Sequence, residues 1–85
     1  GGVLGGILKK GKLKVGDEVY LISDEIGIKR AEVLSIELGG KSVEVARKGD
    51  DVGVVFDHEV AGGRSQVAGR IGSGTEVYVI RNKIV

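Results

Sequence analysis

The residues of this sequence that are best suited to binding chemistry are clustered cations. Lysines occupy positions 9, 10, 12 and 14, within a stretch of 16 residues that has no acidic side chain. The alternation of Lys10, Lys12 and Lys14 predicts that they share one face of a strand or one side of a loop. Such a row can bind the phosphates of a nucleic acid, and it can equally protect a strand edge from pairing with another chain.

A glycine-rich segment carries a second group of cations. Gly62 and Gly63 precede Arg64, and Gly69 precedes Arg70. Glycine lets backbone N–H groups approach an anion, and arginine can bind phosphate oxygens in pairs. If the two chain ends meet in space, we expect one phosphate-contacting patch made of Lys10, Lys12, Arg64 and Arg70. The alternative is a surface hairpin whose glycines only form the turn.

No set of residues predicts catalysis. The sequence has no cysteine, which removes thiol nucleophiles and cysteine metal sites. The segment Gly40-Lys41-Ser42 matches the end of a phosphate-binding P-loop, but Ser35 stands where that motif needs its first glycine. His58 is the only histidine, and its acidic neighbours would point to the opposite strand face. We therefore expect no catalytic residue, no metal and no cofactor, and a protein that is not an enzyme.

Length and composition indicate a single globular domain over residues 1–85. Hydrophobic residues make up 41% of the chain and charged residues 29%. No apolar run approaches the roughly 18 residues of a membrane span, and no signal segment opens the chain. We therefore expect a cytoplasmic protein without a membrane partner. Because the chain begins Gly-Gly rather than Met, we also expect it to be a piece of a longer protein.

The net charge of +1 conceals an uneven distribution. Residues 1–16 and 60–85 are basic, whereas residues 17–59 contain 11 acidic and 5 basic side chains. The termini of small domains often lie close together, so the two basic ends would form one face opposite the acidic middle. Ordinary mixed surface charge is the alternative.

Apolar residues recur mostly with period two, and glycine-rich turns separate the apolar runs. This pattern predicts an all-β fold, a small closed or nearly closed antiparallel barrel of about six strands. The expected turn glycines are Gly11, Gly16, Gly49 and Gly74. Gly16 and Gly49 each precede an aspartate and an apolar strand, so we expect backbone conformations there that are costly for other residues.

The same alternation predicts which side chains point inward. They are Val19, Leu21, Leu34, Ile36, Val52, Val54, Phe56, Val77 and Val79. The three aromatic residues, Tyr20, Phe56 and Tyr78, all lie in apolar runs. We therefore expect no exposed aromatic ring for stacking on bases, and no sequence-specific reading of single-stranded RNA.

Four motifs resemble a known family. They are Gly11-x-Leu13-x-x-Gly16-Asp17-x-Val19, then Val33-x-Ser35-Ile36-Glu37, then Ser42-Val43-x-x-Ala46-x-x-Gly49-Asp50-x-Val52-Gly53, and finally Gly69-Arg70-Ile71-x-x-Gly74-x-x-Val77-Tyr78. Together they are similar to the β-barrel domain that follows the GTPase domain in elongation factor Tu and in initiation-factor GTPases. The resemblance covers roughly residues 3–80; the chain departs from it in segment 57–68 and in having no proline.

The resemblance implies a non-enzymatic binding module. Such a module would contact the backbone of tRNA or rRNA, or would pack on a GTPase domain or another protein. In some members of the family, the region corresponding to residues 62–70 lies near the acceptor end of a tRNA. The alternative is a stand-alone structural or protein-interaction barrel, natural or designed, with no nucleic-acid role.

Overall fold

The computed structural model describes residues 3–23, 27–58, 65–71 and 75–81, with side chains described for residues 3–22 and 27–58. These residues form strands and turns and contain no helix. No membrane-spanning helix is therefore found among them. The strands are β1 (Leu4–Lys10), β2 (Lys12–Lys14), β3 (Glu18–Ser23), β4 (Gly27–Leu38), β5 (Lys41–Val43), β6 (Val45–Arg47), β7 (Asp51–Phe56), β8 (Ser65–Ile71) and β9 (Thr75–Arg81).

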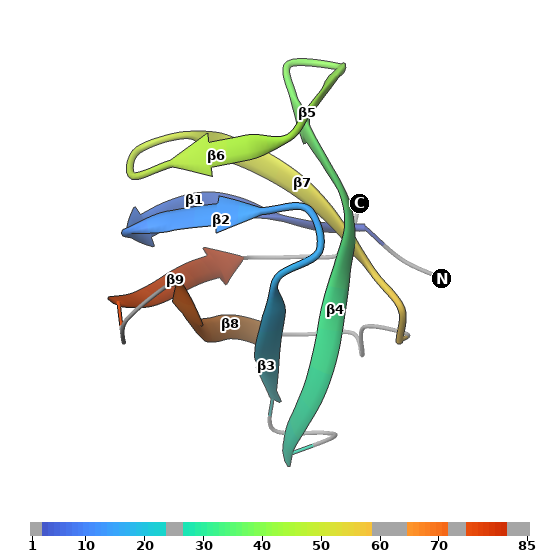
Figure 1. The fold of residues 1–85 in the computed structure, drawn as a ribbon, viewed down its shortest axis with the longest axis vertical. Helices are drawn as coiled ribbons and strands as arrows, with labels where there is room; N and C mark the ends of the chain where they lie inside the picture. The colour runs from blue at the N-terminus through green and yellow to red at the C-terminus, as the bar shows by residue number, and fades with distance from the viewer. Residues whose placement is uncertain (1–2, 24–26, 59–64, 72–74, 82–85) are drawn as a thin grey trace.

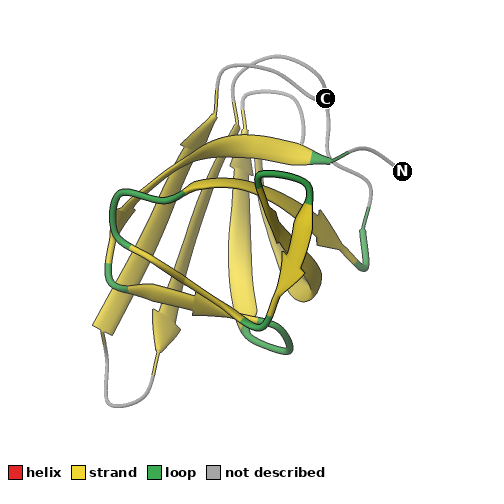
Figure 2. Cartoon of the chain, turned by 90° about the horizontal axis from the view of Figure 1, so that it is seen from above, coloured by secondary structure: helices red, strands yellow, loops and turns green. Residues whose placement is uncertain are grey.

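Six of these strands curl into a barrel whose pairings return to their starting point (Figures 1 and 2). The order is β3-β8-β9-β1-β7-β4, and β4 pairs again with β3. Every neighbouring pair is antiparallel. The predicted small antiparallel barrel is thus confirmed. The first and last strands lie side by side, with Ile7 opposite Ile80.

The remaining three strands are short additions to the barrel. β5 pairs with the end of β4 through a hairpin at Gly39-Gly40, where both glycines have positive φ. The segment Gly40-Lys41-Ser42 therefore belongs to a hairpin and not to a P-loop. β2 and β6 pair only with each other and form a separate two-stranded sheet. β6 of this small sheet contacts β1 and β4 of the barrel.

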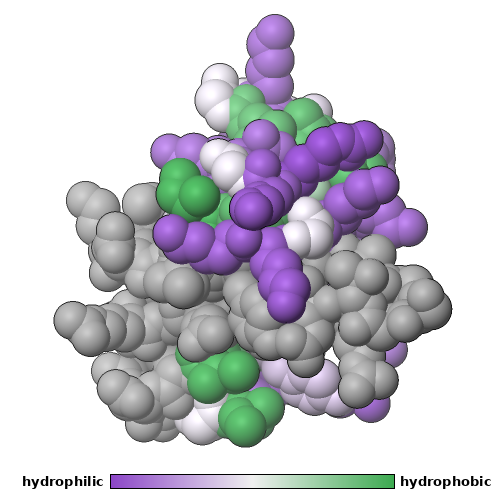
Figure 3. Space-filling view, turned by 90° about the vertical axis from the view of Figure 1, so that its left-hand side faces the viewer, coloured by the Kyte–Doolittle hydropathy of each residue, from purple (hydrophilic) through white to green (hydrophobic). Residues whose placement is uncertain are grey.

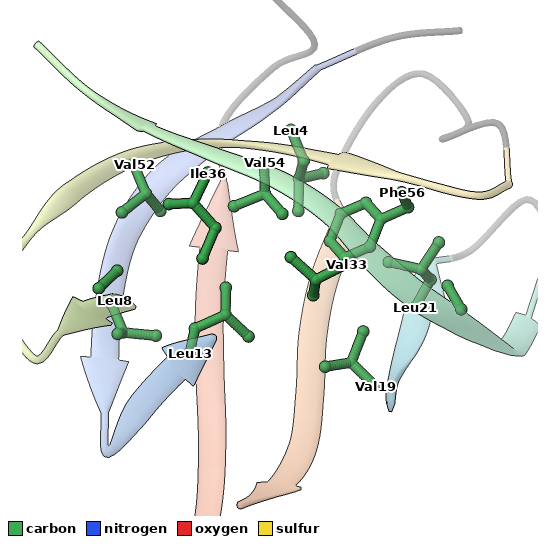
Figure 4. Close-up of a cluster of buried hydrophobic side chains, with 12 residues drawn as sticks. Leu4, Leu8, Leu13, Val19, Leu21, Val33, Ile36, Val52, Val54 and Phe56 are labelled. Carbon is green, nitrogen blue, oxygen red and sulfur yellow. The ribbon is translucent and has the colours of Figure 1, made fainter. Parts of the chain in front are cut away.

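The core confirms most of the predicted inward residues. Val19, Leu21, Ile36, Val52, Val54 and Phe56 are all at most 5% exposed. The core also contains Leu4, Leu8, Leu13, Ala31, Val33 and Ala46, which the alternation did not single out (Figure 4). The side chains of Val77 and Val79 are not among those that the structure describes.

Leu34 was predicted to point inward, and this prediction is wrong, because its side chain is 49% exposed. The pairing of β4 with β7 shifts between Val33 and Ser35, where one extra residue enters β4. A β-bulge of this kind breaks the period-two alternation, so that both Val33 and Ile36 point inward. β1 has a similar shift between Leu8 and Lys10.

Candidate nucleic-acid interface

The small sheet of β2 and β6 leads at one end into a tight turn at Gly16. The Asp17 N–H donates to the carbonyl of Lys14 at 3.1 Å, and the Asp17 carboxylate accepts the Lys14 N–H at 2.8 Å. Gly16 has a φ of 92°, in the region that disfavours residues with a Cβ, as the sequence leads us to expect. The turn is therefore closed by one backbone hydrogen bond and by a second hydrogen bond to the Asp17 side chain.

An equivalent turn follows β6 at the other end of the small sheet. The Asp50 N–H donates to the carbonyl of Arg47 at 3.0 Å, and the Asp50 carboxylate accepts the Arg47 N–H at 2.8 Å. Gly49 has a φ of 94°. The two turns thus share their bonding pattern, their glycine and their aspartate.

Both turns are bonded to strands of the barrel. The Gly16 N–H donates to the Val33 carbonyl at 2.8 Å, and the Val33 N–H donates to the Asp17 carbonyl at 2.9 Å. The second turn makes the same exchange with Leu8. The Gly49 N–H donates to the Leu8 carbonyl at 2.8 Å, and the Leu8 N–H donates to the Asp50 carbonyl at 2.9 Å. The small sheet is therefore fastened to the barrel at both ends.

The inner face of the small sheet is apolar and its outer face is basic. Leu13 and Ala46 are directly paired, and both are 0% exposed. Lys12 lies directly opposite Arg47, and Lys14 lies opposite Val45. We call Lys12, Lys14 and Arg47, whose side chains are all exposed, the basic ribbon. In the part of the chain that the structure describes, no carboxylate forms an ion pair with any of the three.

This arrangement places like charges opposite each other, which destabilises a two-stranded sheet. The three cations come from short strands whose ends are hydrogen-bonded to the barrel through the two turns. Lys12 and Lys14 alternate with the buried Leu13, so their Cα atoms are about 7 Å apart. The ribbon can therefore offer several positive charges to closely spaced phosphates. Hydrophilic side chains dominate the upper half of the face shown in Figure 3.

The structure separates some of the residues that the sequence grouped. β1 ends at Lys10, and Gly11, with a φ of 69°, turns the chain before Lys12 begins β2. The expectation that Lys10, Lys12 and Lys14 share one strand face is therefore wrong. Lys10 is exposed and pairs with Tyr78 of β9.

The remaining predicted residues lie where side chains are not described. Arg70 belongs to β8, where it pairs with Glu76, and only its backbone is described. Arg64 and Gly74 lie outside the described residues. Nothing in the structure tests their proposed roles.

Sequence reasoning missed Arg47, because counting charge along the chain assigned it to the acidic middle. Its partner Lys12 is 35 residues away in the sequence, and only the pairing of β2 with β6 brings them together. The repeated Gly-Asp step was the available signal, since it follows both Lys14 and Arg47 at the same spacing. Lys48 is exposed in the turn that follows Arg47.

His58 lies outside this site. Its Nε2 atom is 3.9 Å from a carboxylate oxygen of Asp57, and both side chains are largely exposed. Asp57 in turn accepts the Glu32 N–H at 2.7 Å, a bond that joins the middle of β4 to the residue that follows β7. Across the described residues, no group of three potential ligands could hold a metal ion.

Comparison with known proteins finds relatives of two kinds. The chain is 39% identical to the uncharacterized protease MJ0090 of Methanocaldococcus jannaschii, across 85% of this chain and 15% of that protein. It is 44% identical to translation initiation factor 2 subunit gamma of Pyrococcus horikoshii and 46% identical to that of Pyrococcus abyssi, in each case across 64% of this chain and 15% of the factor. No protein-family profile and no solved structure matches the chain.

The chain is therefore homologous to a segment of translation initiation factor 2 subunit gamma and to a segment of the uncharacterized protease, and it spans about one seventh of the length of these relatives. Its curled, all-β antiparallel fold is consistent with the β-barrel domain of translation factors. The resemblance that the turn and strand motifs predict is confirmed.

Proposed function

We propose that this domain is a non-enzymatic binding module that contacts the phosphate backbone of tRNA or rRNA through the basic ribbon. The observation that carries the proposal is the pairing of Lys12 with Arg47 on the outer face of the small sheet. The homology to translation initiation factor 2 subunit gamma supports an RNA ligand. The implied setting is the cytoplasm, within a longer protein.

The energetics of the ribbon favour an anionic ligand. Two cations that face each other across a strand pair repel, and no described carboxylate forms an ion pair with either of them. A phosphate between them would remove this repulsion. Contacts of this kind fix the position of a nucleic acid without reading its sequence, so affinity should be weak and similar for different RNAs.

The test is a titration of fluorescently labelled tRNA at low and moderate salt. With three effective contacts, log affinity should fall with log salt at a slope of roughly −2 to −3. Lys12→Glu and Arg47→Glu should each weaken binding and make the slope less negative by roughly 1. Lys10, Arg64 and Arg70 are the further candidates, and the double reversal of Arg64 and Arg70 tests whether the C-terminal segment contributes.

The matched control is Lys41→Glu. Lys41 is exposed in β5, on the hairpin that extends β4, and its reversal changes the net charge as much as Lys12→Glu does. Equal weakening by both variants would show that only overall charge matters. Absence of any tRNA binding by the wild-type protein at low salt would overturn the proposal.

A further inference from the structure

The outer face of β3 and β4 carries an aromatic ring that the sequence led us to expect to be covered. Tyr20 is 47% exposed, because it lies between the inward-pointing Val19 and Leu21. Directly opposite it in the ladder is Arg30. The expectation that no exposed aromatic is available for stacking is therefore wrong.

The guanidinium of Arg30 forms an ion pair on the same outer face. Its Nη2 atom donates to Oε2 of Glu18 at 2.6 Å, although both side chains remain more than 60% exposed. An ion pair with this exposure adds little stability. Each group keeps unused hydrogen-bonding capacity, because arginine has five N–H donors and a carboxylate has about four acceptor sites.

Glu18, Val19, Tyr20 and Arg30 line a depression of about 370 Å³. This volume lies at the lower end of the range of small-molecule sites and suits one planar group. A tyrosine ring offers a stacking surface, a guanidinium donates to ring nitrogen or carbonyl acceptors, and a carboxylate accepts from amino groups. Adenine, guanine and cytosine each offer a ring face, acceptor atoms and an amino group, and the purines present the larger face for stacking.

We infer that this depression, the Tyr20 site, binds one unpaired purine base of a single-stranded RNA. The inference rests on the proposed function, since the basic ribbon would supply the phosphate contacts. The Tyr20 site would add a preference for unpaired purine bases, which the phosphate contacts of the basic ribbon cannot provide. A base within a duplex is already stacked on its neighbours, so the Tyr20 site would favour single strands over duplexes.

The experiment compares oligo(A), oligo(U) and an RNA duplex of the same length, each titrated at low salt. Wild type should bind oligo(A) several times more tightly than oligo(U). Tyr20→Ala should weaken oligo(A) binding about tenfold, in line with the loss of one stacked base. It should leave duplex binding unchanged, and Tyr20→Phe should retain most of the affinity for oligo(A).

Ile28→Ala is the matched control. Ile28 lies in the same strand pair and is 71% exposed, but it does not line the depression. Its truncation should leave oligo(A) binding intact. If Ile28→Ala weakens binding as much as Tyr20→Ala does, the face acts as a general surface and the base site is excluded. Far-UV circular dichroism of every variant establishes that the barrel is folded.

A spectroscopic readout tests the stacking directly. The chain has two tyrosines and no tryptophan, so a Tyr78→Phe background leaves Tyr20 as the sole tyrosine emitter. Oligo(A) should quench this emission, and the duplex should not. Duplex binding through the ribbon without quenching by oligo(A) would overturn the Tyr20 site and leave the proposed function standing. Failure of both RNAs to bind would overturn both.

Discussion

Asp17 and Asp50 hold the same place in two turns at opposite ends of the β2–β6 sheet. Each carboxylate accepts the N–H of the residue three positions earlier, at 2.8 Å in both turns. Between the turns, Leu13 pairs with Ala46 at the centre of the sheet. Val19 and Val52, two residues after the aspartates, are both 2% exposed. The same Gly-Asp turn therefore occurs twice, each time between a strand of the small sheet and a strand of the barrel.

We expect Asp17→Ala and Asp50→Ala to destabilise the domain to a similar extent. Each removes a side-chain acceptor of a backbone N–H, which costs about 1 kcal/mol. Urea unfolding measures the change, and Asp51→Ala is the control, because Asp51 is exposed on the neighbouring strand. A large effect of one aspartate and none of the other would contradict the equivalence of the turns.

Gly16→Ala and Gly49→Ala should each cost about 1 kcal/mol or more of unfolding free energy. At both glycines a Cβ would meet no atom within 4 Å, so the cost is purely that of the positive φ. Denaturant titration of the two variants checks this. Neutral or stabilising effects of both substitutions would show that the backbone of the turns can leave the positive φ region without a cost in stability.

Substitution by alanine should cost different amounts of stability at two residues that the period-two pattern predicts to be equally buried. Phe56→Ala should cost about 3–5 kcal/mol, because Phe56 is only 5% exposed. Leu34→Ala should cost well under half as much, since the bulge leaves Leu34 at 49% exposure. Comparable losses in thermal or urea unfolding would mean that the bulge is misplaced.

The Lys12→Glu variant should be more stable than wild type while binding RNA less well. The substitution replaces a like-charged pair with an oppositely charged one, which is worth about 0.2–1 kcal/mol in an antiparallel sheet. Urea unfolding at low salt measures the gain, which should shrink as salt is added. A destabilised variant would show that Lys12 and Arg47 do not repel each other in the free protein.

Much of the fold could be predicted from the sequence because its signals are local. The alternation around Val52, Val54 and Phe56 and the glycine turns are sufficient to predict short strands. The inward position of Val33 could not be predicted, because a bulge shifts the alternation by one residue and leaves no separate mark in the sequence.

The candidate site was less accessible to prediction than the fold. Lys12 was expected to contribute to it, but Arg47 joins it only through pairing across 35 residues. Tyr20 lies in the apolar run Val19–Ile22, which suggests burial on both faces. Its exposure follows from the single-layered barrel wall, where one face of every strand is directed outward.

The pairing of β1 with β9 has a consequence for the order of folding. Ile7 and Ile80 are almost a whole chain apart in sequence, so the ring cannot close until the last strand has been made. Contacts of such high sequence separation slow folding, because the loop must be closed before the contact is gained. During synthesis, β1 and β8 would each present an open edge, and such edges pair readily with other chains. A nascent chain that stops short of β9 is therefore the form of this domain most exposed to aggregation.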